Sequence, residues 1–218
     1  MNMPRATSEV LKRVPTASHY GLEYLLNGRS FSYAHQIHTV AMASPEHVLE
    51  VGVGATIVAD VLRRAGIRVT TLDVESSLRP NVIGSVTAIP LADDCVEGAM
   101  CCQVLEHLPF EHFTVALREL RRVSQRFLVL SLPDASRHWG ITLALPKVGR
   151  RSIHFSPRTL RRPLIPPERL EHMGHHWEIG FRGYSMARVA MAVRDAGWKV
   201  KRTWRVPELP WHRFFECV

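Results

Sequence analysis

A turn that contains two glycines, Gly52 and Gly54, follows the apolar run 47–51 and precedes a helical pattern. Glycine lets the backbone come close to a ligand, and the start of a helix offers unpaired N–H groups. Asp73 ends the next apolar run, where a carboxylate can accept hydrogen bonds from both hydroxyls of a ribose. Together these residues predict a site for a ligand that contains a nucleoside.

The residues around this turn favour one kind of nucleotide over another. The fingerprint of a dinucleotide-binding turn ends in glycine or alanine, and this chain has Ile57 at that position. Glu50, two residues before Gly52, places a carboxylate where it would repel phosphates and attract a cationic group. S-adenosylmethionine carries a sulfonium and an ammonium group and no phosphate, so these residues favour it over a dinucleotide.

Four short motifs follow one another along the chain: Val48-Leu49-Glu50-Val51-Gly52-Val53-Gly54, Val69 to Asp73, Ile89-Pro90-Leu91 followed by Asp93-Asp94-Cys95-Val96, and Gln103-Val104-Leu105-Glu106-His107-Leu108. They resemble the motifs of class I (Rossmann-like) S-adenosylmethionine-dependent methyltransferases of the small single-domain bacterial type. Four ordered motifs are far more specific than one. The resemblance therefore implies an enzyme of this family, with S-adenosylmethionine as its cofactor.

The resemblance also implies a set of cofactor-binding residues. Glu50, Gly52 and Gly54 would line the methionine part of the cofactor, Asp73 and Val74 the ribose and adenine, and Gln103 and Val104 the wall beside the sulfonium. Two further positions depart from the family pattern. Thr56 stands where a third glycine is frequent, and its hydroxyl either contacts the ligand or caps the following helix. Ser85, followed by Val86, stands where an acidic residue often holds the adenine amino group, and it can still accept a hydrogen bond.

Methyl transfer from a sulfonium needs proximity, orientation and, for an O–H or N–H acceptor, a base. The sequence offers three candidate catalytic residues: His107 after the fourth strand, and His176 and Glu178 in a histidine-rich loop. The alternative for His107 is packing or helix capping, and the alternative for the loop is a purely structural role. No metal site is predicted, because His172, His175 and His176 stand close together in an expected loop, which lacks the helical i, i+4 geometry of common zinc motifs.

Two further groups of residues have both a functional and a structural interpretation. Tyr20, Tyr33 and His35 either close over the cofactor and the acceptor or pack as a plain lid. The run Lys147 to Arg162 holds six basic and no acidic residues, which would suit an anionic acceptor such as a nucleic acid. Because Phe155 is its only aromatic residue, we expect a solvated basic lid and do not favour nucleic acid as the acceptor.

Strand and helix patterns alternate from residue 47 onward, as in a sheet whose parallel strands are joined by helices. Strands are expected at 47–51, 68–73, 81–85, 96–102, 126–132, 198–206 and 212–218, and helices at 56–65, 111–124 and 185–196, with a short helix near 20–26. Prolines and glycines argue against long regular elements in 134–184. The pattern predicts an α/β fold of three αβα layers, with a doubly wound, mostly parallel seven-stranded sheet and an antiparallel last strand.

The length and composition fit one domain. With 218 residues and 46% hydrophobic residues, the chain is expected to form a single methyltransferase domain over 1–218. Its expected parts are an N-terminal cap (1–45), a cofactor-binding core (46–133), a lid or substrate insertion (134–184) and a C-terminal helix with strands (185–218). We find no signal-peptide pattern and no apolar run long enough for a membrane span. We therefore expect a cytoplasmic protein with reduced cysteines and no membrane partner.

These observations predict a methyltransferase that modifies an oxygen or a nitrogen of a small molecule or saccharide. Two alternatives stay open. One is an RNA or protein methyltransferase that uses the basic run, which contributes to the formal charge of +8. The other is a non-catalytic nucleotide-binding scaffold, suggested by Ser85 and by the unusual Glu97-Gly98-Ala99 of the fourth strand. The sequence leaves the acceptor and the oligomeric state open.

Overall fold

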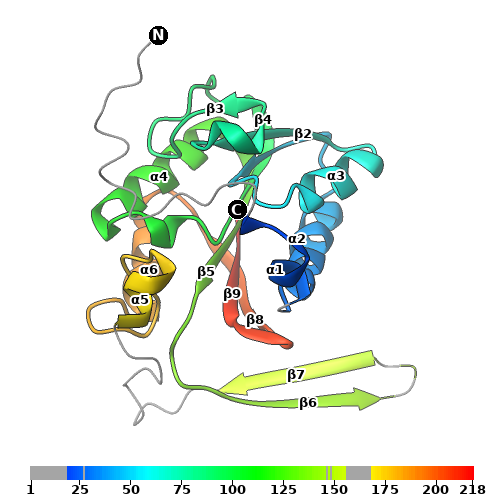
Figure 1. Ribbon diagram of the computed structural model, residues 1–218, viewed down its shortest axis with the longest axis vertical. Helices are drawn as coiled ribbons and strands as arrows, with labels where there is room; N and C mark the ends of the chain where they lie inside the picture. The colour runs from blue at the N-terminus through cyan, green and yellow to red at the C-terminus, as the bar shows by residue number, and fades with distance from the viewer. Residues whose placement is uncertain (1–18, 27, 146, 148, 156–167) are drawn as a thin grey trace.

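The computed structural model describes residues 19–26, 28–145, 147, 149–155 and 168–218, in which helices flank a large sheet (Figure 1). The strands are β1 (His47–Val51), β2 (Arg68–Asp73), β3 (Val82–Ile83), β4 (Val96–Cys102), β5 (Ser124–Pro133), β6 (Trp139–Leu145), β7 (Gly149–Phe155), β8 (Val200–Val206) and β9 (Leu209–Cys217). The helices are α1 (Leu22–Leu26), α2 (Arg29–Ala43), α3 (Ile57–Arg64), α4 (Phe110–Val123), α5 (Glu168–Met173) and α6 (Met186–Asp195), with 3₁₀ turns η3 (Ser76–Leu78) and η4 (Leu105–His107).

The main sheet has seven strands in the order β3-β2-β1-β4-β5-β9-β8. β9 runs antiparallel to both of its neighbours, and the pairs among β1 to β5 are parallel. The doubly wound sheet with an antiparallel last strand is therefore confirmed. The strand order reverses between β1 and β4, so the loops that leave these two strands diverge and open a crevice at the carboxyl edge.

Helices cover both faces of the main sheet, which gives the three layers expected from the sequence (Figure 1). α4 and α6 pack on one face through a cluster of buried side chains that includes Phe113, Leu117 and Val193. α2 and α3 pack on the other face, around Val40 and Leu62. The helical spacing of the apolar residues explains this burial, because residues three or four positions apart lie on the same side of a helix.

Local signals in the sequence correctly predict several boundaries. Ser185 caps α6, since its Oγ accepts the N–H of Arg188 at 3.2 Å. The unusual residues of the fourth strand coincide with an irregularity, as the register of β4 against β5 shifts between Val96 and Gly98. A Cβ atom on Gly98 would lie 2.2 Å from the ring of Phe127. Glycine at this position therefore makes room for the aromatic ring.

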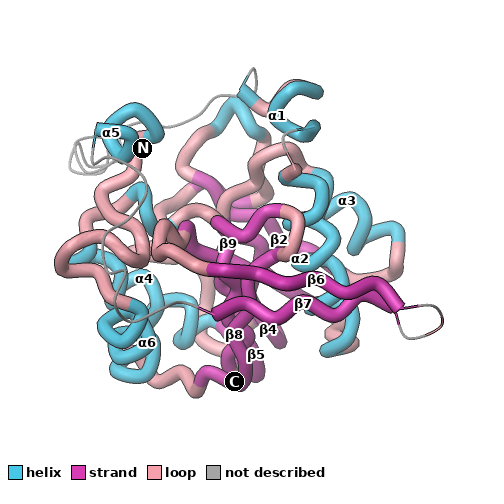
Figure 2. The backbone as a smooth tube through the Cα atoms, turned by 90° about the horizontal axis from the view of Figure 1, so that it is seen from below, coloured by secondary structure: helices cyan, strands magenta, loops and turns pink. Residues whose placement is uncertain are grey.

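The segment after β5 differs from the expectation. β6 and β7 form an antiparallel hairpin, so the prediction that 134–184 lacks long regular elements is wrong for this stretch. Neither 139–145 nor 149–155 contains a proline, so the prolines that led to the prediction fall outside the two strands, and β6 and β7 accommodate the two glycines Gly140 and Gly149. Seen from below, the hairpin crosses in front of the main sheet and projects past it on the side of α2 and α3 (Figure 2).

The N-terminal segment contains more helix than expected. The short helix near residues 20–26 is confirmed as α1, but the longer helix α2 was not predicted. The four cysteines are free, in agreement with the expectation of unpaired thiols. None of the helices in the described part of the chain is long and apolar enough to cross a membrane.

Candidate active site

The glycine turn lies at the carboxyl end of β1, where the strand order reverses. Gly52 has a φ of +84°, and a Cβ atom at this position would lie 2.4 Å from Cγ2 of Val104. Real Cβ atoms essentially never make so short a contact, so only glycine lets the turn pass under Val104. The turn leads directly into α3, whose first N–H groups have no partner within the helix.

Asp73, at the end of β2, is hydrogen-bonded to the glycine turn. Its Oδ2 accepts the N–H of Val53 at 2.9 Å, and its Oδ1 accepts the N–H of Glu75 at 2.9 Å. A carboxylate has about four lone-pair sites, so both oxygens can accept further bonds from ligand hydroxyls. Asp73 therefore fixes the turn and still lines a cavity together with Val74.

Glu50 is a buried carboxylate in β1. The residue is 6% exposed, and its Oε2 has no hydrogen-bond partner. Burial, partly offset by Arg63, raises the pKa of Glu50 to about 8. An unpaired buried carboxylate is unfavourable, so this oxygen fits a ligand that brings a cationic group.

The N-terminal helices close one side of the crevice with aromatic and cationic side chains. Tyr20 and Tyr33, which the sequence places over the site as one of two alternatives, line the cavity that contains Glu50. Burial raises the pKa of both phenols, which keeps them protonated at neutral pH. Arg29 lines the same cavity, with its guanidinium 4.0 Å from the centre of the Tyr24 ring.

Two other residues of this region, His35 and Arg29, refine the sequence analysis. His35 lies away from the crevice, where it accepts the indole N–H of Trp204 at 3.4 Å. The sequence analysis missed Arg29 because it did not predict α2. Ile37 and Val40 lie three positions apart, as residues on one face of a helix do. A helix predicted from them would have placed Arg29 at its start, beside the site.

Three cavities lie along the crevice, with volumes of about 80, 110 and 260 Å³. The first cavity contains Glu50 and the glycine turn, and the second lies beside Asp73. The third extends toward Trp211. Tyr20 and Gln103 line all three, so the cavities meet at these two side chains.

All ten residues that the resemblance implies for cofactor binding line the first or the second cavity. They are Glu50, Gly52, Gly54 and Thr56 in the first, Gly52 again with Asp73, Val74, Ser85 and Val86 in the second, and Gln103 and Val104 in both. Two of the hydroxyls already have protein partners. The Thr56 hydroxyl donates to Asp60 at 3.0 Å, and the Ser85 and Thr87 hydroxyls lie 2.8 Å apart.

Gln103 is held in a strained conformation at the point where the cavities meet. Its φ is +57°, a left-handed value that costs a residue other than glycine about 1 to 3 kcal/mol and is common at functional sites. Its N–H donates to the Ser131 carbonyl at 2.9 Å, and its Nε2 donates to the Ser131 hydroxyl at 2.8 Å. These two bonds to β5 fix the direction of the amide side chain.

Three titratable side chains cluster at the third cavity. Ligand atoms of Glu106, His107 and His175 all lie within 4.8 Å of one another. Glu106 is fully buried and neither carboxylate oxygen has a hydrogen-bond partner. Burial raises the pKa of Glu106 to about 7. Burial, together with the neighbouring His175, lowers the pKa of His107 to about 4.

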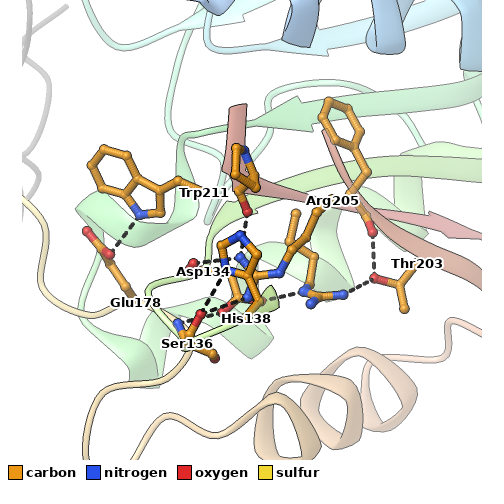
Figure 3. Close-up of polar contacts among 10 residues, drawn as sticks. Asp134, Ser136, His138, Glu178, Thr203, Arg205 and Trp211 are labelled. Atoms are coloured by element: carbon orange, nitrogen blue, oxygen red, sulfur yellow. Dashed lines mark hydrogen bonds and ion pairs between the residues drawn. The ribbon is translucent and has the colours of Figure 1, made fainter. Parts of the chain in front are cut away.

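The three candidate catalytic residues occupy different positions. His107 lines the second and third cavities. Glu178 is fully buried behind His175: its Oε1 accepts from His175 Nδ1 at 2.7 Å, and its Oε2 accepts from the indole of Trp211 at 3.0 Å (Figure 3). His176 is not among the described residues that line the three cavities. The geometry therefore favours His175 over His176 as the side chain that faces the acceptor.

Solved structures of methyltransferases share this arrangement of strands and helices. One is 1,6-didemethyltoxoflavin-N1-methyltransferase from Burkholderia thailandensis, with bound 1,6-didemethyltoxoflavin and S-adenosylhomocysteine (TM-score 0.57, 14% identity, 100% of this chain and 90% of that chain). Another is magnesium protoporphyrin IX methyltransferase from Synechocystis PCC 6803, with bound S-adenosylhomocysteine (TM-score 0.59, 15% identity, 88% and 83%). At these identities the likeness establishes the fold.

The sequence itself supports the same assignment. Residues 49–126 match the family model described as a methyltransferase domain, and this range contains the glycine turn, Asp73 and Gln103. This match over part of the chain, together with the fold, indicates that the protein is an S-adenosylmethionine-dependent methyltransferase. No curated protein matches the sequence.

The cofactor of this methyltransferase is S-adenosylmethionine, and the residues of the crevice fit it. The unpaired Oε2 of Glu50 suits the ammonium group of the methionine part. The space under Val104, which a Cβ atom on Gly52 would fill, lets the chain turn close to a ligand. Both observations concern the methionine part of the cofactor, which distinguishes it from a dinucleotide.

A buried ion-pair network fixes the far wall of the methyltransferase site. Asp134, just after β5, pairs through Oδ2 with Arg205 at 2.7 Å (Figure 3) and with Arg213 at 2.5 Å. Its backbone N–H donates to the carbonyl of Trp211 at 2.8 Å. Because Trp211 lines the third cavity and binds Glu178, this network positions the wall against which His175 lies.

Proposed function

We propose that this methyltransferase modifies an oxygen or a nitrogen of a small molecule, a saccharide included, that binds in the third cavity. The observation that carries the proposal is the position of Tyr20 and Gln103 on all three cavities. An acceptor in the third cavity would meet the cofactor at these two side chains. A volume of about 260 Å³ is near the lower end of the range for small-molecule pockets.

In this proposal the first and second cavities hold the cofactor. Glu50 binds the ammonium group, and the turn from Gly52 to Gly54 passes beside the methionine part. Asp73 accepts hydrogen bonds from the ribose hydroxyls, as a carboxylate at the end of this strand typically does. Val74 and Val86 enclose the adenine, and Ser85 offers a hydroxyl at its edge.

The bound cofactor supplies an activated methyl group on a sulfonium whose leaving group is neutral. The protein then has to orient the acceptor and remove or exclude its proton. Gln103, fixed by Ser131, and Tyr20 hold the acceptor atom in line at the junction of the cavities. His107 and His175 face the acceptor, and Glu178 acts as a positioning residue through its bond to His175.

The test is a measurement of S-adenosylhomocysteine release from a panel of small hydroxyl and amine acceptors, with folded RNA and protein substrates assayed in parallel. We expect turnover with members of the small-molecule set. Turnover confined to RNA or protein, at rates that fall steeply with added salt, would contradict the proposed acceptor class and favour a macromolecular substrate.

A further inference from the structure

The side chains at the third cavity form a ligand set drawn from two distant segments. Glu106 and His107 lie in η4, directly after β4, and His175 lies in the loop after α5. One atom from each of the three lies within 4.8 Å of the others. The sequence analysis considered only the three histidines of the loop, so it could not pair His175 with the η4 residues.

The carboxylate of Glu106 is buried and has no hydrogen-bond partner. It is 0% exposed, it lines the third cavity, and neither of its carboxylate oxygens is hydrogen-bonded. Buried polar groups almost always have partners, because desolvation without compensation is unfavourable. A cation held between this carboxylate and the two histidines would supply the partner that both oxygens lack.

The two histidines are oriented as metal ligands usually are. The Nδ1 of His107 lies 3.1 Å from the carbonyl oxygen of Gly174, which can only accept, so Nδ1 carries the proton and Nε2 the lone pair. The Nδ1 of His175 donates to Glu178 at 2.7 Å, which fixes the same tautomer. A carbonyl or carboxylate that binds the second ring nitrogen is the typical outer shell of a ligating histidine.

The outer shell is itself fixed. Glu178 receives a second hydrogen bond from the indole of Trp211, and the backbone carbonyl of Trp211 accepts from the N–H of Asp134. His175 therefore cannot swing away from Glu106 without breaking a buried chain of bonds. Such rigidity is what a metal site needs to keep its geometry.

We propose that Glu106, His107 and His175 bind one divalent transition-metal ion, with Zn²⁺ as the ion that the donors fit best. Two imidazole nitrogens and one carboxylate form the three-ligand set of open catalytic zinc sites, in which the fourth position is left for water or substrate. All three residues line the third cavity, which would leave room for a fourth ligand.

The role of the ion rests on the proposed function. An acceptor hydroxyl or amine that coordinates the ion loses its proton to solvent more readily, since a bound cation stabilises the deprotonated form. The electron pair of that atom then forms the new bond to the methyl carbon, while the carbon–sulfur bond breaks and its electrons remain on sulfur. This favours acceptors with a metal-binding hydroxyl or amine.

The test is metal binding by the full chain, measured without any acceptor. After dialysis against Zn²⁺ at micromolar concentration we expect about one equivalent per chain by elemental analysis. Replacing a ligand, in Glu106→Gln or His175→Asn, should weaken binding by at least about 100-fold, and Glu178→Gln by roughly 10- to 100-fold because it acts in the outer shell. His38→Asn, an exposed histidine on α2, is the matched control and should bind like the wild type.

Two results would overturn the metal site. One is a wild-type chain that retains well under one equivalent of Zn²⁺, and the other is unchanged Zn²⁺ affinity in both ligand variants. If the ligand variants do not fold, Co²⁺ added to the wild type decides: strong visible bands of a four-coordinate ion support the site, and the weak spectrum of the hydrated ion overturns it. Release of S-adenosylhomocysteine with the panel of small acceptors, measured in the same samples, separates failure of the metal site from failure of the proposed function.

Discussion

The carboxylate of Asp73 accepts the backbone N–H of Val53 at 2.9 Å, so the acid at the end of β2 also fixes the glycine turn after β1. Asp73→Asn should weaken S-adenosylmethionine binding by about 10- to 100-fold, because charged hydrogen bonds contribute about 1.5 to 3 kcal/mol each. Calorimetry measures this affinity. Asp195→Asn, exposed on α6, is the control, and an unchanged affinity in Asp73→Asn would place the ribose elsewhere.

Gly52→Ala should abolish cofactor binding, because the added Cβ atom would lie 2.4 Å from Val104. Gly66→Ala is a matched control: Gly66 has a similar φ of +87°, but a Cβ atom there would meet nothing within 4 Å. The backbone strain is therefore comparable in the two variants, and only the clash differs. Equal losses of cofactor affinity in both, measured by equilibrium dialysis, would show that strain alone matters.

The buried Glu50 predicts a dependence of stability on pH. Its pKa rises from the ordinary 4.5 to about 8 in the folded, ligand-free protein, so the folded state retains a proton that the unfolded state has lost. The contribution is present at low pH and is lost as the pH rises toward 8. Glu50→Gln should flatten this decline, so that urea unfolding shows the variant gaining stability relative to wild type between pH 5 and pH 8. Parallel curves for the two proteins would contradict it.

The local features of the site could be predicted from the sequence, whereas contacts between distant segments could not. The glycine turn and Asp73 each lie at the end of a strand, so their residue types and the strand pattern are enough to predict them. All ten expected cofactor residues line the first or the second cavity. The choice between His175 and His176 depends on how one irregular loop turns, and neighbouring residues in a loop have no fixed periodicity. Glu106 enters the sequence analysis only as part of the fourth motif, since its burial depends on packing against the loop near His175.

The wall of the third cavity could not be predicted from the sequence either. Its buried ion pairs give a prediction about stability. Asp134 and Arg205 both have side chains that are 1% exposed. Asp134→Ala would leave the buried Arg205 guanidinium without its carboxylate counter-ion, which should lower the free energy of unfolding by about 3 to 5 kcal/mol. Lys201→Ala, which removes an ion pair whose lysine is 62% exposed, should cost about 1 kcal/mol or less. Chemical denaturation compares the two, and similar losses would mean that the buried network contributes little.

The most direct measurement is calorimetric titration of the folded wild-type chain with S-adenosylmethionine and with S-adenosylhomocysteine. We predict that both bind with a stoichiometry of one per chain, and that Gly52→Ala removes the binding of both while Gly66→Ala retains it. If the folded protein produces no binding heat with either compound up to millimolar concentrations, the crevice between β1 and β4 is not a working cofactor site.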